Sequence, residues 1–118
     1  MEIAKSERLC QNVASSVHDV RQAFRSATPV PKILDRFWRL QDDVYRLLEA
    51  LTDSPVEAAE TLRLYPSLLK DVVDVLEFTS KLQSFRNIPA LREAGESINN
   101  SLLEIQYLKQ SHAMAAAV

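Results

Sequence analysis

The sequence predicts an all-α protein, an antiparallel helical bundle of four long helices plus one short helix. The 118 residues include a single glycine, Gly95, and strand-rich folds need more glycine for their positive-φ turns. Apolar residues recur at steps of three and four over long segments, which is the spacing of one helix face. Five prolines stand where a helix would start or stop. No segment shows the alternating pattern of a half-buried strand.

The first two helices are expected over about residues 4–27 and 31–52. Their apolar stripes are Leu9, Val13, Val17, Val20, Phe24 and Ala27 in the first, and Ile33, Phe37, Leu40, Val44, Leu47 and Leu51 in the second. Pro29 and Pro31 make the connection short and stiff. The second stripe has the coiled-coil-like spacing of a helix that packs at a shallow angle against a neighbour.

Three further helices follow in the second half of the chain. Ser54-Pro55-Val56-Glu57 predicts a helix start with a capping box, in which Ser54 is the N-cap and Glu57 its reciprocal partner. Tyr65-Pro66 predicts a break or sharp kink that keeps this helix short. The most apolar helix is expected over about 66–85 and the last over about 89–111. We expect residues 1–112 to form a single helical-bundle domain, followed by a frayed C-terminal tail, 113–118.

Gly95 falls within the last predicted helix. Glycine there costs about 1 kcal/mol relative to alanine, so a compensating reason is expected. One interpretation is that Gly95 lets another helix approach closely, and the other is a local kink or partial break.

Signatures of catalysis and of metal binding are missing from the sequence. There is no phosphate-binding loop, nucleophile elbow or HExxH motif. Cys10 is the only cysteine, and His18 and His112 lie at opposite ends of the chain. We therefore expect a protein that is not an enzyme, with no catalytic residue, no cofactor and no metal.

Location is predicted from equally simple features. The N-terminal residues lack the apolar region of a signal peptide, and no apolar run is long enough for a membrane span. The net charge of −2 gives no strong overall attraction to anionic partners. We expect a soluble, cytoplasmic protein.

Charge is nevertheless unevenly distributed. Positions 21–39 contain five basic residues and one acidic residue. Positions 42–77 contain nine acidic residues and three basic residues. Three interpretations of the basic region stay open. It can be a solvated face with internal ion pairs such as Asp35 with Arg39, a docking surface for an acidic protein or a second copy, or a weak site for nucleic acid or anionic lipid.

Trp38 lies beside Phe37 in the middle of the basic region. Adjacent residues project about 100° apart on a helix, so Trp38 is either a core-edge side chain or an interface anchor. We predict a non-catalytic protein-protein interaction module (an adaptor, chaperone or assembly subunit) that binds a partner helix or a second copy through a helical face. The alternative is a nucleic-acid- or anionic-lipid-binding module. The predicted contact residues are Arg21, Arg25, Lys32, Arg36, Phe37, Trp38 and Arg39.

Overall fold

The computed structural model describes residues 5–26 and 28–117, and within them the side chains of all but residues 83, 84 and 112–117. This part of the chain forms six helices and no strand, which confirms the all-α prediction. The helices are α1 (Lys5–Arg25), α2 (Val30–Asp53), α3 (Pro55–Arg63), α4 (Leu68–Ser80), α5 (Gln83–Asn87) and α6 (Pro89–Ala117).

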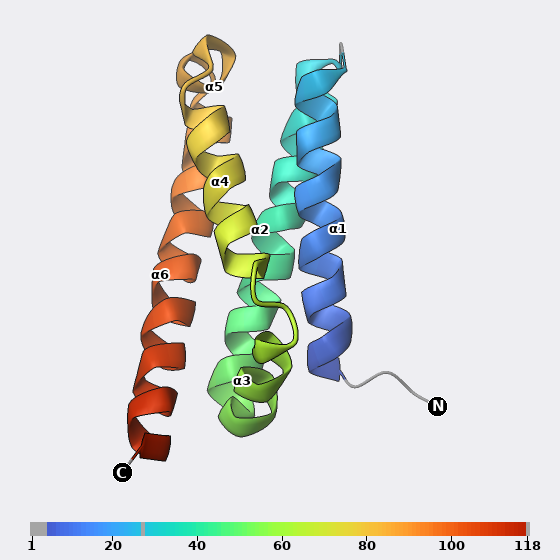
Figure 1. Ribbon diagram of the computed structural model, residues 1–118. Coiled ribbons are helices and arrows are strands. Elements are labelled where there is room, and N and C mark those ends of the chain that lie inside the picture. The colour runs from blue at the N-terminus through green and yellow to red at the C-terminus, as the bar shows by residue number, and fades with distance from the viewer. Residues whose placement is uncertain (1–4, 27, 118) are drawn as a thin grey trace.

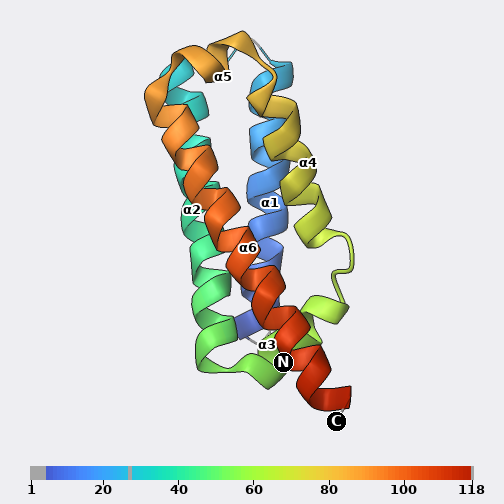
Figure 2. The ribbon, with the colours of Figure 1, turned by 90° about the vertical axis from the view of Figure 1, so that its left-hand side faces the viewer.

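The four long helices alternate in direction along the chain, and α3 and α5 lie at opposite ends of the bundle (Figure 1). The order in space differs from the order in sequence. Helix α2 packs on α1 and α6, and α4 packs on the same two helices. As a result α2 and α4 lie diagonally opposite, and α3 makes the diagonal step between them. Helices α2 and α6 are therefore neighbours that run in the same direction (Figure 2).

Ser54 both ends α2 and begins α3. Its backbone N–H donates to the Ala50 carbonyl at 2.8 Å, and its own carbonyl accepts from the Ala58 N–H at 3.0 Å. The helix start at Pro55 is confirmed, but the predicted capping box is wrong because the Ser54 side chain makes no cap hydrogen bond. The physical reason is that α2 already uses the Ser54 amide, which Glu57 would need.

The predicted break at Tyr65-Pro66 is confirmed, because α3 ends at Arg63 and α4 begins at Leu68. The helix expected over 66–85 is in fact two helices. Leu82 adopts an extended conformation with φ −79° and ψ 136°, and α5 follows as a separate short helix. At the other end, α6 continues to Ala117, past the predicted end near 111.

An aromatic cluster fills the core near the α5 end of the bundle. The Phe37 ring lies 5.9 Å from that of Phe24 and 5.8 Å from that of Phe85, measured between ring centroids. Helix α6 continues through Gly95 without a break. A Cβ atom at Gly95 would lie 2.8 Å from Cζ of Phe85, so a larger residue here would have to displace the aromatic ring that approaches from α5.

Candidate functional site

The predicted contact residues do not form one surface. Phe37, on α2, is fully buried at 0% exposure and packs against Phe24 of α1 and Phe85 of α5. This corrects its inclusion among the contact residues, because a side chain in the core cannot touch a partner. Phe37 belongs to the apolar stripe of α2, and burial of that stripe is what α2 contributes to folding.

Lys32, Arg36 and Arg39 lie together on α2, where they border a shallow depression with Asp35. Arg36 is partly committed to α1. Its Nη1 lies 4.0 Å from Oδ1 of Asp19 and donates to the Asp19 carbonyl at 3.4 Å. The Asp35–Arg39 ion pair, which one of the three open interpretations included, is not formed within 4.0 Å. Among described residues, the ion pairs are Arg36–Asp19 and Arg46–Asp42.

Arg21 and Arg25 lie on a different flank of the bundle, between α1 and α4. Their neighbours are Asp74, Val75 and the half-exposed Phe78. The five cations of the basic region thus border two different hollows, with Lys32, Arg36 and Arg39 at one and Arg21 and Arg25 at the other.

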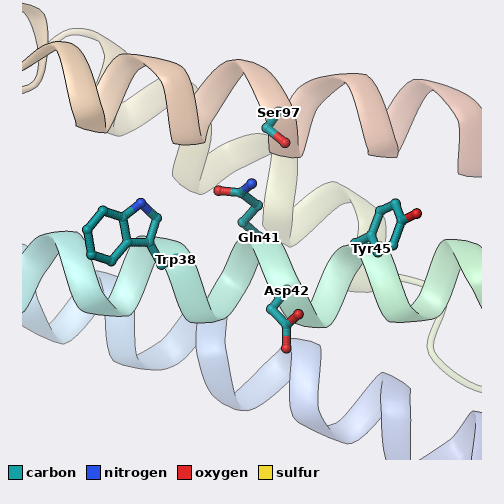
Figure 3. A pocket seen from close by; sticks show the side chains of 5 residues that line it. All are labelled: Trp38, Gln41, Asp42, Tyr45 and Ser97. Carbon is teal, nitrogen blue, oxygen red and sulfur yellow. The ribbon is translucent and has the colours of Figure 1, made fainter.

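Trp38 is 50% exposed and lies on the flank of α2 that faces α6. It borders a shallow groove of about 490 Å³ between the two helices, with Gln41, Asp42, Tyr45 and Ser97 as the other lining residues. Figure 3 shows Gln41 reaching from α2 toward Ser97 on α6, with Trp38 and Tyr45 on either side. Trp38 and Tyr45, two helical turns apart, therefore lie at the edge of the same depression.

The depression continues along α6. A second hollow shares Tyr45 and Ser97 with the first and adds Leu48, Glu93, Glu96, Asn100, Ser101 and Glu104. We call the two together the α2–α6 groove. No lysine or arginine is among its lining residues. Asp42, at the edge, points away from α6 and pairs with Arg46 at 2.9 Å.

The three glutamates of the groove, Glu93, Glu96 and Glu104, are exposed side chains on α6. None of them forms an ion pair within 4.0 Å with any described residue. The α2–α6 groove therefore combines exposed aromatic rings with an excess of negative charge.

Cys10 is fully buried in α1. Burial, and to a smaller extent the charge of Glu7, raises the pKa of its thiol to about 11. The thiol is accordingly protonated at neutral pH, which is the opposite of what a nucleophilic cysteine requires. Within the described part of the chain, no three His, Cys, Asp or Glu side chains gather to hold a metal ion.

No helix in the described ranges combines the length and apolar character needed to cross a bilayer. Comparisons of the chain with protein-family models, curated proteins and solved structures find no match. The α2–α6 groove is thus assigned from its own geometry and chemistry.

Sequence reasoning identified Trp38 but missed its companions in the groove. Tyr45 follows Trp38 by two helical turns, a spacing that places both on one flank. That signal was available, but the pairing of α2 with α6 was not, because it depends on the diagonal step made by α3.

Proposed function

We propose that this protein is a non-catalytic protein-protein interaction module that holds a partner helix in the α2–α6 groove. The observation that carries the proposal is the pair of half-exposed aromatic side chains, Trp38 and Tyr45, at the edge of one groove. Tryptophan and tyrosine, together with arginine, are the residues enriched among binding hot spots. A groove between two helices is also a common seat for an amphipathic helix.

The proposed surface is narrower than the one predicted from sequence. Trp38 and Tyr45 lie on the α6 side of α2, whereas Arg36 binds Asp19 on the α1 side. A single helix laid along the groove would reach Trp38 without reaching Arg36. Of the seven predicted residues, Trp38 is the one that we keep in the contact surface.

The alternative function, binding of nucleic acid or anionic lipid, would use Lys32, Arg36 and Arg39. The depression that they border also contains Asp35, and Arg36 is engaged by Asp19. Both features reduce its attraction for phosphate. The groove is therefore the better supported surface.

Affinity capture from the native source tests the proposal. The Trp38→Ala/Tyr45→Ala variant should lose the captured partner, while thermal stability changes little. The matched control is Val56→Ala/Leu64→Ala, which removes two exposed apolar side chains outside the groove and should keep the partner. Retention of the partner by the groove variant would contradict the proposal. Binding to RNA or anionic liposomes at low salt, lost in Lys32→Glu/Arg39→Glu, would favour the alternative.

A further inference from the structure

We propose that the partner of the α2–α6 groove is a cationic amphipathic helix. Its apolar stripe packs on Trp38 and Tyr45, and its lysine or arginine side chains meet the glutamates of α6. This inference rests on the proposed function and adds the chemistry of the partner to it.

Charge complementarity is the first argument. The groove carries Glu93, Glu96 and Glu104 without an ion-pair partner among described residues, and no lysine or arginine lines it. A cationic helix would be attracted at long range and would pair with these carboxylates on arrival. An acidic helix of the same shape would be repelled, so the groove discriminates between partners by the sign of their charge.

The aromatic rings supply the second argument. Trp38 and Tyr45 are each about half exposed, at 50% and 53%. The face of an aromatic ring attracts a guanidinium or ammonium group. The methylene stems of lysine and arginine also pack well on apolar surface. A basic helix therefore gains contacts from both the aromatic and the acidic parts of the groove.

The length of the groove sets the size of the occupant. Glu93 and Glu104 both line it, and the rise of a helix places them about 16 Å apart along α6. A partner helix of about three to four turns would cover this span. Such a helix would present one cationic flank toward α6 and one apolar stripe toward α2.

The basic segment 32–39 of a second copy of this chain is the less suitable occupant. Its cations on α2, Lys32 and Arg39, are interrupted by Asp35. Within positions 32–39, the exposed large apolar side chain is Trp38, which already belongs to the groove. This segment therefore offers no cationic helix with a separate exposed apolar stripe.

The test uses Trp38 itself, because it is the only tryptophan in the chain and its fluorescence reports directly on the groove. The probe is a synthetic helical peptide of about four turns with a leucine stripe and lysines on one flank. Its twin has glutamate in place of every lysine. We expect the cationic peptide to shift Trp38 emission in a saturable way, with an affinity that falls as salt rises. The acidic twin should bind at least about tenfold more weakly.

Matched variants assign the charge effect to the groove. Glu93→Gln/Glu104→Gln should weaken binding of the cationic peptide about tenfold and reduce its salt dependence. The control, Glu57→Gln/Glu60→Gln, neutralises two exposed acids on α3 and should leave the affinity unchanged.

Each contrary outcome has its own meaning. Equal binding of both peptides, or no response from either, overturns the cationic partner and leaves the groove as a docking site to be judged by the capture experiment. Self-association that disappears in Trp38→Ala/Tyr45→Ala, measured by sedimentation, makes the occupant a second copy and also overturns this inference alone. If that variant retains the captured partner, the proposed function fails together with the inference.

Discussion

Helix α2 packs against two long helices, and its two flanks are built differently. On the α1 side, the Ser16 hydroxyl donates to the Asp43 carboxylate and the Arg36 guanidinium binds Asp19. On the α6 side, no side-chain hydrogen bond or ion pair crosses between the two helices among the described residues. That side instead presents the exposed rings of Trp38 and Tyr45.

Under the proposed function, one helix serves stability on one flank and binding on the other. On the α1 flank, Ser16, Asp43 and Arg36 find their polar partners within the protein. On the α6 flank, the aromatic side chains of α2 and the glutamates of α6 are exposed to solvent, where a partner could contact them. If this contrast is correct, substitutions on the two flanks will have opposite consequences for stability and for binding.

The largest expected effect comes from the adjacent pair Phe37 and Trp38. Phe37→Ala should lower the free energy of unfolding by about 3–5 kcal/mol, because it removes a fully buried ring. Trp38→Ala should cost less than about 1 kcal/mol, because half of the side chain is already exposed. Urea denaturation followed by circular dichroism measures both values. Equal losses for the two variants would place Trp38 in the core and remove the contrast.

A second test compares two serines that face different seams. Ser16→Ala should cost about 1–2 kcal/mol, because it removes the hydroxyl that donates to the half-buried carboxylate of Asp43. Ser97→Ala, in the groove, should change stability by less than about 0.5 kcal/mol. Both substitutions have the same intrinsic effect on helix propensity, so their difference reports on the hydrogen bond and the burial of Ser16. Denaturant titration of both variants in the same buffer measures the two losses of unfolding free energy. Equal losses would show that the α1–α2 and α2–α6 contacts are alike and would contradict the contrast.

Gly95 offers a smaller effect of definite sign. Gly95→Ala should destabilise the protein by about 1 kcal/mol, because the new Cβ meets Cζ of Phe85 at 2.8 Å. When Phe85→Ala is also present, the same substitution should instead stabilise by about 1 kcal/mol through helix propensity. A double-mutant cycle of thermal unfolding measures this change of sign. Additive effects would show that Phe85 does not require the glycine.

The smallest expected effect concerns Cys10, which reports on opening of the core. Burial raises the pKa of its thiol to about 11 from the ordinary 9.0. Near pH 8 the ionised fraction of the thiol is therefore about 100-fold smaller than in a free cysteine. Labelling with a thiol reagent should be slow, and Trp38→Ala/Tyr45→Ala should leave the rate unchanged. Phe37→Ala should accelerate it.

Because folding favours the protonated thiol, the free energy of unfolding should fall as pH rises from 9 toward 11.

Much of the fold follows from local sequence. The apolar stripe of α2 is buried as its spacing predicts. In α1 the stripe is buried from Leu9 to Val20, Phe24 is partly exposed, and Ala27 lies outside the described residues. Pro29, Pro55 and Pro66 lie between helices or at their starts. The capping box at Ser54 fails because two helices share one residue. The break before α5 was not predicted, because neither of the residues at the break, Lys81 and Leu82, is a proline or a glycine.

The candidate site was less predictable than the fold. A stripe shows which residues of a helix are buried, but it does not show which helix covers each edge of the stripe. In a simple up-down bundle, α2 would lie beside the next long helix, α4. The diagonal step made by α3 places α2 beside α6 instead, and this brings Tyr45 next to Ser97. No local pattern encodes that step.

The diagonal step also has a consequence for the order of folding. Helices α1 and α2 are joined by a short connection, so their contact closes a small loop and is favoured to form early. The contact between α2 and α6 closes a much longer loop, the segment that holds α3, α4 and α5, so it is expected to form later. We therefore expect the groove to be completed last, so that a partner recognising both of its walls would select chains that have finished folding.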